Sequence, residues 1–343
     1  MTRYIIRRLL QAIPLLIIIS AIIFLLINAM GDPLASFGGR RRIRSQDRER
    51  LTRQLGLDKP VLVQYVVWLF GNDWMKIDMD GDGIPETPGK RKGVLRGDFG
   101  KSLMERRPVL EIIGERINNT LLLMITTEIV VWIFALGIGI YSALRQYSTL
   151  DNVITAFSFI GYSMPVFWLA LILMFIFAVN FKQWGLPYFP TVGMYDLEAG
   201  KTVLQVAWHM VLPVTTMSII SVAGYSRYVR SQMLEVISQD YIRTAYAKGL
   251  PQRMVLLGHA LKNAALPLVT IEGMSLPLLI GGAVVTETIF AWPGMGRLYI
   301  EAASDTDIPV LMGILMIIST LVVVFQIITD ITYTFLDPRI RYD

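Results

Sequence analysis

Six long apolar runs constrain this chain more than any other feature of its sequence. They cover residues 9–29, 121–144, 153–179, 206–225, 266–290 and 310–335, and Leu, Ile, Val, Phe and Met dominate each of them. Each run is long enough to cross a bilayer core of about 30 Å. Lipid admits only structures whose backbone polar groups are satisfied internally. The sequence therefore predicts an all-α integral membrane protein with six transmembrane helices.

The first apolar run could be mistaken for a signal peptide. It follows Arg3, Arg7 and Arg8, and a basic start of this kind is typical of secretory signals. However, the run has about 20 residues, which is enough to span a membrane, and no convincing small-residue cleavage site follows it. We therefore expect a retained helix.

The orientation of the helices follows from the basic residues in the short connections between them. The connections on one side, together with both termini, hold 12 Lys and Arg residues, whereas those on the other side hold three. Short cytoplasmic loops carry an excess of Lys and Arg. This bias predicts that both termini are cytoplasmic and that the long segment 31–118, between the first two helices, is a large extracytoplasmic segment.

Composition excludes several classes of function. The chain has no cysteine, so disulfides, thiolate zinc sites and cysteine nucleophiles are excluded. Its two histidines, His209 and His259, are too few for a histidine-built metal centre. Neither HExxH nor GxSxG occurs, which disfavours a membrane enzyme. The net charge of +5 does not indicate nucleic acid here, because in a membrane protein the placement of the charges matters more than their sum.

An acidic stretch inside segment 31–118 has alternating carboxylates followed by a glycine. Its candidate calcium ligands are Asp78, Asp80, Asp82 and Glu86. The first six positions fit the loop of an EF-hand, but the twelfth position is Gly89, where an EF-hand has a bidentate Glu. The stretch is therefore either a shorter structural calcium loop, with Glu86 as a late ligand, or an acidic turn without a metal.

The connection between the fourth and fifth runs has the pattern of two short helices joined by a glycine turn. Ala245 and Ala247 offer a surface for close packing, Gly249 is a C-terminal stop, and Pro251 is favoured in the first turn of the next helix. A rigid elbow of this kind on the cytoplasmic side could transmit force to a cytosolic partner.

Several segments resemble the permease subunits of binding-protein-dependent ABC importers, in the oligopeptide, dipeptide and nickel branch. The segments that carry the resemblance are QDYIRTAYAKG (239–249), HALKNAALP (259–267), GGAVVTETIFAWPGMG (281–296), DPRIR (337–341), GDP (31–33) and GDFG (97–100). The resemblance covers nearly the whole chain, except for an Asp-rich insertion near residues 73–93. The general signature of the superfamily starts Glu-Ala-Ala. This sequence departs from it, because residues 243–245 are Arg-Thr-Ala.

The resemblance also implies a domain organisation. Residues 1–30 would be the cytoplasmic N-terminus and first transmembrane helix, residues 31–118 the extracytoplasmic segment with the Asp-rich insertion, and residues 119–343 the other five helices of the ABC permease domain. Residues 229–265 would form a cytoplasmic coupling loop. The protein would be a multi-pass protein of a prokaryotic cytoplasmic (inner) membrane.

The resemblance further implies partners and a coupling site. The partners would be a second homologous permease, in a heterodimer, two ATP-binding cassette ATPase subunits that bind and hydrolyse ATP with magnesium, and an extracytoplasmic peptide-binding protein. This chain would need no cofactor for transport and would not itself be an enzyme. The residues expected to couple it to an ATPase are Asp240, Arg243, Thr244, Ala245, Lys248 and Gly249. The solute would be a dipeptide or oligopeptide, and the same branch handles nickel, glutathione and other small solutes.

Candidate pathway residues lie in the second and fifth runs. Glu128 is well inside the second run, where an unpaired carboxylate is costly, so it should face protein or water and could meet the solute. Pro277, Gly281 and Gly282 let a helix bend or a neighbour approach, which fits either a gating helix or close packing. Glu287, near the outer end of that run, could contact solute or a delivering protein, or be an ordinary interfacial acid.

A function of another class is also compatible with six apolar helices. A self-sufficient channel or secondary transporter would work without ATP or partner subunits. No convincing internal repeat occurs, so inverted-repeat transporter architectures gain no support.

Overall fold

The computed structural model describes residues 2–29, 49, 52–53, 56–78, 86–265, 268, 271 and 284–336. Five helical segments in this part of the chain are long and apolar enough to cross a membrane: Ile6–Ala29, Val109–Leu144, Val166–Gln183, Val203–Ile237 and Ile308–Ile331. The prediction of a helical protein with membrane-spanning segments is confirmed. Most of the fifth predicted run, 266–290, lies outside the described residues, so the count of six spans stays a prediction.

The chain divides into two compact units. The first comprises residues 1–118 and 298–323, and the second comprises residues 119–297 and 324–343. Three helices, α4 (Val109–Leu144), α14 (Met295–Ser304) and α15 (Ile308–Leu336), contribute residues to both units. The predicted domains are defined by position relative to the membrane, with residues 31–118 as a segment of their own. The two compact units do not test that prediction, which stays open.

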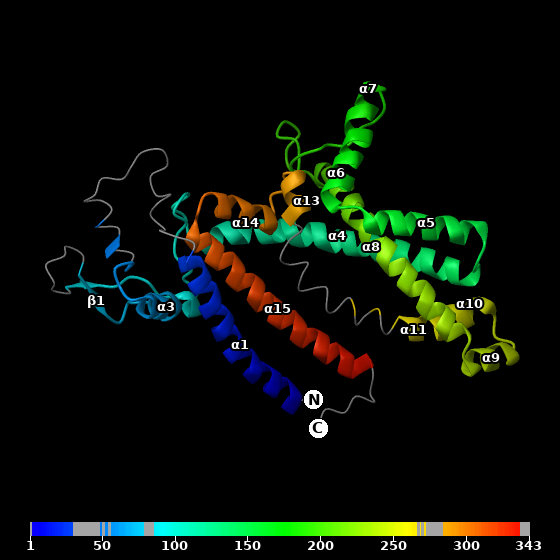
Figure 1. The fold of residues 1–343 in the computed structure, drawn as a ribbon, viewed down its shortest axis with the longest axis horizontal. Coiled ribbons are helices and arrows are strands. Elements are labelled where there is room, and N and C mark those ends of the chain that lie inside the picture. Colours follow the sequence, from blue (N-terminus) through cyan, green and yellow to red (C-terminus); the bar gives the residue numbers. More distant parts are fainter. Residues whose placement is uncertain are drawn as a thin grey trace. The chain divides into compact units, whose positions relative to one another are not determined.

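In the first unit, helix α1 (Thr2–Ala29) packs against the shorter helix α3 (Val61–Phe70), as Figure 1 shows. Pro60 precedes α3 and Gly71 ends it, as expected from residues that favour helix starts and stops. Aromatic rings join the two helices: Phe24 lies 5.4 Å from Tyr65 and 5.8 Å from Trp68, measured between ring centroids.

A small hairpin and a short helical turn follow α3 in this unit. Strands β1 (Lys76–Ile77) and β2 (Thr87–Pro88) pair antiparallel, with Lys76 opposite Pro88 and Ile77 opposite Thr87. The 3-10 helix η1 (Val94–Arg96) comes next. The Asp-rich stretch is thus the connection of a hairpin, with Asp78 after β1 and Glu86 before β2, whereas Asp80 and Asp82 lie outside the described residues.

In the second unit, the third predicted span is not one helix. Helix α5 (Thr149–Ser163) ends before Pro165, and α6 (Val166–Met174) begins after it and continues through the π-helix η2 (Phe175–Asn180) into α7 (Phe181–Gln183). Met164 is extended, with a ψ of 132°, because a following proline disfavours the helical conformation. The prediction of a single helix over 153–179 is therefore wrong.

Helix α8 (Val203–Ile237) is the central element of the second unit, and α5 and α6 both pack against it (Figure 1). It extends well beyond the predicted end at residue 225. Three short helical pieces follow its end: α9 (Asp240–Ala247), α10 (Gln252–Met254), and the π-helix η3 (Val255–Ala260), which runs into α11 (Leu261–Ala264). Helix α13 (Val284–Ile289) contacts α6 and α8.

Candidate functional site

Helix α9 is held to the second unit by two residues of one face. Ile242 is 1% exposed and Ala245 is 7% exposed, and both belong to a buried apolar cluster. The other buried members of this cluster come from α4, α8 and the segment after α9: Ala143, Val229, Met233, Val236, Val255, Leu256, Ala260, Ala264 and Leu268. Burying a side chain of the size of Ile242 stabilises the packing by roughly 1.5–3 kcal/mol. The helix is therefore seated firmly although it has only eight residues.

The opposite face of α9 is exposed. Asp240, Arg243, Thr244 and Lys248, four of the six predicted coupling residues, lie on it or directly after it. The Asp240 and Arg243 side chains are 3.6 Å apart and are 96% and 75% exposed, so their ion pair contributes little to stability. Polar side chains that do not stabilise the fold remain available to a partner.

A glycine turn ends α9, as the sequence predicts. Gly249 has a φ of +75°, is exposed, and has nothing within 4 Å of the position that a Cβ would take, so the backbone conformation rather than crowding requires glycine there. Pro251 then precedes α10. The helix, turn and helix pattern is confirmed, with one difference: six residues of the second helical part, Val255–Ala260, are π-helical.

The coupling residues thus divide into two groups. Asp240, Arg243, Thr244, Lys248 and Gly249 are exposed, whereas Ala245 faces the buried cluster. In this structure Ala245 fixes the helix in place and does not face outward. That the exposed group contacts an ATPase stays a prediction.

An ion pair that sequence reasoning missed joins α5 to α8. Arg230 donates from Nε to Oδ1 of Asp151 at 3.0 Å and from Nη2 to Oδ2 at 2.9 Å. The Asp151 side chain is 2% exposed and also accepts a bond from the Tyr147 N–H at 2.9 Å. The Arg230 guanidinium, helped by this N–H, holds the pKa of Asp151 below its ordinary value of 3.8.

Glu287 is the centre of a second buried polar group. It is 0% exposed, and its carboxylate accepts bonds from the Thr120 hydroxyl at 2.8 Å and from the Arg297 N–H at 3.1 Å. Gly294 packs directly against this carboxylate, where a Cβ would collide with it. Thr120 accepts in turn from the Met295 N–H at 2.7 Å. Through these bonds Glu287 attaches the 291–297 turn to α4. That Glu287 contacts the solute stays a prediction.

The other predicted pathway residues are less informative. Glu128 is half-buried on α4. Pro277, Gly281 and Gly282 lie outside the described residues. In the described part of the chain, no three His, Cys, Asp or Glu side chains gather as a metal site would require, but half of the predicted calcium ligands lie outside that part.

Two family descriptions match this sequence. Residues 135–342 match the "Binding-protein-dependent transport system inner membrane component" family, and residues 1–124 match its N-terminal counterpart, "Binding-prot-dependent transport system membrane comp, N-term". The chain belongs to this family. The protein is therefore a multi-pass permease component of a transport system in an inner membrane, as the resemblance implies.

Named relatives align with the permease along its whole length. Oligopeptide transport system permease protein AppB of Bacillus subtilis (strain 168) is 41% identical over 344 residues, covering 100% of both chains. Dipeptide transport system permease protein DppB of Escherichia coli (strain K12) is 33% identical over 363 residues, covering 100% of this chain and 99% of the relative. Glutathione transport system permease protein GsiC of Salmonella choleraesuis (strain SC-B67) is 34% identical over 343 residues, covering 100% of both.

A solved structure shares the fold. A chain of the MetNI methionine ABC transporter, solved in inward-facing conformations, superposes with a TM-score of 0.51 over 66% of this permease and 97% of that chain. The two sequences are 16% identical, so the likeness concerns the fold alone.

Proposed function

We propose that this permease imports dipeptides or oligopeptides, driven by ATP that separate subunits hydrolyse. The relatives named as oligopeptide, dipeptide and glutathione permeases support a peptide solute, since glutathione is itself a tripeptide. The alternative is a permease for nickel, glutathione or another small solute, which the same branch also handles. A self-sufficient channel would be the alternative mechanism.

The observation that carries the proposal is the two-sided character of α9. One face is fixed by Ile242 and Ala245 in the apolar cluster, and the other presents charged and polar side chains to the surroundings. A partner that pushes on the exposed face would move the cluster with it, because tightly packed cores transmit displacement. The exposed face of α9 would therefore be the contact with an ATPase subunit.

The assembly would contain four transport subunits and a delivery protein. This permease and a second, homologous permease would form the pathway, two ATPases would bind ATP and magnesium on the cytoplasmic side, and an extracytoplasmic peptide-binding protein would supply the solute. Five helical segments of spanning length, together with a sixth span in the region of residues 266–290, would place both termini in the cytoplasm.

We also propose that the connection between β1 and β2 holds a structural calcium ion. The paired strands bring Asp78 and Glu86 to the two ends of a short connection that also contains Asp80 and Asp82. Gly89, the twelfth position of the loop, is buried against Asn72, which leaves no room for the Glu of an EF-hand. Titration calorimetry of the purified chain with calcium tests this proposal, and an Asp78→Ala variant that binds as the parent does would refute it.

Reconstitution tests the main proposal. The permease, its partner permease and both ATPases are placed in liposomes, and peptide uptake and ATP hydrolysis are measured with a peptide-loaded binding protein outside. Uptake that needs both ATP and the partners supports the proposal, whereas uptake by this permease alone would favour a channel. Stimulation by nickel or glutathione in place of other peptides would reassign the solute.

A variant at the turn after α9 tests the coupling contact within the same assay. Gly249→Arg should abolish peptide-stimulated ATP hydrolysis and uptake while the chain still inserts in the membrane. Gly97→Arg is a matched control, because Gly97 is also exposed, has a φ of +77°, and has nothing within 4 Å of an added Cβ. Equal transport by the two variants would refute the coupling assignment.

A further inference from the structure

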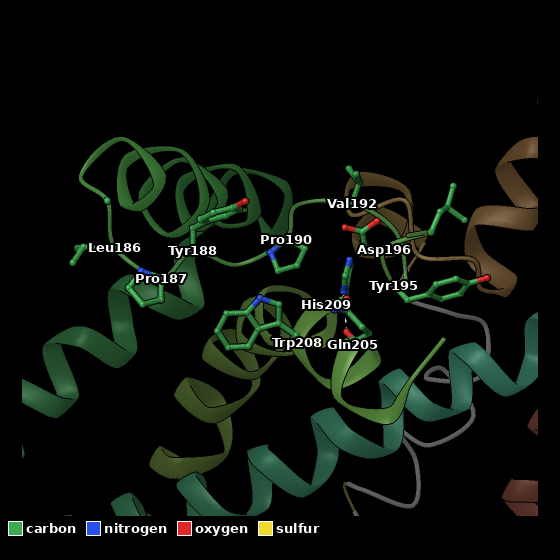
Figure 2. A pocket seen from close by; sticks show the side chains of 12 residues that line it. Leu186, Pro187, Tyr188, Pro190, Val192, Tyr195, Asp196, Gln205, Trp208 and His209 are labelled. Carbon is green, nitrogen blue, oxygen red and sulfur yellow. Dashed lines mark hydrogen bonds between the residues drawn. The ribbon is translucent and has the colours of Figure 1, made fainter. Parts of the chain in front are cut away.

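A cavity of about 800 Å³ lies in the second unit, between the connection after α7 and the first turns of α8. Aromatic rings and prolines form much of its lining, as Figure 2 shows for Tyr188, Pro190, Tyr195 and Trp208. The connection that forms one wall belongs to the short loops predicted on the outer side of the membrane. A cavity of this size suits a group of a few heavy atoms up to a small peptide.

One wall of the cavity carries a buried histidine whose free nitrogen is an acceptor. His209 is 6% exposed, and its Nδ1 lies 2.8 Å from the carbonyl oxygen of Gln205, one turn earlier in α8. A carbonyl oxygen only accepts, so Nδ1 carries the hydrogen. In the neutral ring Nε2 is then left as an acceptor, and in Figure 2 the ring points toward Asp196.

Asp196, an exposed residue at the rim, is the carboxylate among the residues that line this cavity. Its Oδ1 accepts a bond from the Glu198 N–H at 3.1 Å, which fixes the carboxylate in the turn and leaves further acceptor capacity on both oxygens. Among the twelve described residues that line the cavity, Asp196 is the one carboxylate and none is Lys or Arg, although the Nζ atom of Lys182 lies against the Tyr188 ring. The lining therefore disfavours anions.

The aromatic rings of the lining also favour a cation over an anion. The faces of Tyr and Trp rings attract cations through their quadrupoles. The Tyr188 ring already holds the ammonium group of Lys182, whose Nζ atom lies 5.2 Å from the ring centroid, so the rings of Tyr195 and Trp208 are the ones left for a ligand. A carboxylate, an imidazole acceptor and aromatic faces in one cavity suit a compact cation with several hydrogen-bond donors.

We propose that this cavity is a subsite for an ammonium group of the transported peptide, either its free amino end or a lysine side chain. An ammonium group has three donors and no acceptor, which matches the Asp196 carboxylate and Nε2 of His209. The inference rests on the proposed function, because it takes the solute to be a peptide. It adds that the permease itself, and not only a delivery protein, would distinguish peptides with a free amino group.

The test compares trialanine with N-acetyl-trialanine, which lacks the ammonium group, in liposomes that hold the assembled transporter. Asp196→Asn keeps an Oδ1 acceptor for the turn but removes the charge. Glu198→Gln is the matched control, because Glu198 is an exposed carboxylate of the same turn that does not line the cavity. The binding protein is the same in every sample, so its own preference cancels in the comparison of variants.

Asp196→Asn should raise the apparent KM for trialanine roughly fivefold, the effect of losing one partly screened ion pair, and leave that for N-acetyl-trialanine unchanged. Glu198→Gln should change neither value. Equal effects of Asp196→Asn on the two peptides, or none, would overturn the inference while leaving peptide import intact. No uptake of either peptide by the parent transporter would instead count against the proposed function.

A second measurement does not depend on the folding of the Asp196 variant. Trp208 lines the cavity, so trialanine should change the tryptophan emission of the parent complex, and this change should be absent in a Trp208→Phe complex. N-acetyl-trialanine should produce no such change. The same emission change with both peptides, or its survival in Trp208→Phe, would show that the ammonium group is not bound here.

Discussion

Breaking the ion pair between Asp151 and Arg230 should destabilise the permease by an amount that depends on which partner is removed. The Asp151 side chain is 2% exposed, whereas that of Arg230 is 25% exposed. An unpaired carboxylate left at Asp151 has almost no access to water, but an unpaired guanidinium at Arg230 can be partly rehydrated. Arg230→Gln should therefore be more harmful than Asp151→Asn.

The expected magnitudes follow from this difference in burial. Removing one partner of a buried pair costs about 3–5 kcal/mol, which we expect for Arg230→Gln. Asp151→Asn should cost about 2 kcal/mol, because solvent screens the charge that remains. The double variant should be destabilised by less than the sum of the two single variants. Both charges are then absent, so no unpaired charge remains buried.

Thermal unfolding of the purified chain in detergent, followed by tryptophan emission, measures these effects. Asp151→Asn should lower the midpoint by about 3 °C and Arg230→Gln by more. The Asp240→Asn variant is a control, because that carboxylate is 96% exposed and its ion pair should matter little.

The pH dependence has a definite sign. The folded-state pKa of Asp151 lies below its ordinary value of 3.8, so the stabilisation by its charge is fully present above that pH and is lost as the pH falls through the lower folded-state pKa. The difference in midpoint between the parent and Asp151→Asn should be constant from neutral pH down to about pH 5. Additive costs in the double variant, or a loss of the difference already between pH 7 and 6, would refute the assignment.

Two further perturbations test the packing of the other sites by thermal unfolding. Ile242→Ala should cost about 2–4 kcal/mol, because it opens a hole in the apolar cluster that fixes α9, whereas Tyr241→Ala on the exposed side should change stability by less than about 0.5 kcal/mol. Gly294→Ala should sharply lower the yield of folded protein in membranes, because the added Cβ would collide with the buried Glu287 carboxylate. Gly258→Ala is the control and should leave the yield unchanged, because nothing lies within 4 Å of an added Cβ there. Equal effects within either pair would contradict the packing described here.

Hydrophobic run length predicts much of this fold because the bilayer requires long apolar helices. Run length predicts the wrong helix end where a helix continues beyond the membrane into polar surroundings. The last turns of α8 contain Arg227 and Arg230, which end the apolar run, yet Val229, Met233 and Val236 recur at helical spacing and are buried. That periodicity was a readable signal for the longer helix, as Pro165 was for the break between α5 and α6.

The buried polar groups of the second unit could not be predicted from the sequence. Asp151 and Arg230 are 79 positions apart, and Thr120 and Glu287 are 167 positions apart. No local pattern pairs such residues, because only the packing of helices brings them together. The turn at Gly249 was predictable, since a left-handed glycine after a short helix is a local property.

Site-directed cross-linking from α9 shows directly whether an ATPase subunit binds the exposed face of this helix. The chain has no cysteine, so Lys248→Cys supplies a unique attachment point beside the turn at Gly249. In the assembled complex it should cross-link to an ATPase subunit, whereas Lys201→Cys, predicted on the outer side, should not. If the Lys248→Cys side chain reacts only from outside the cell, or cross-links to no ATPase subunit in an active complex, then α9 is not the contact with an ATPase.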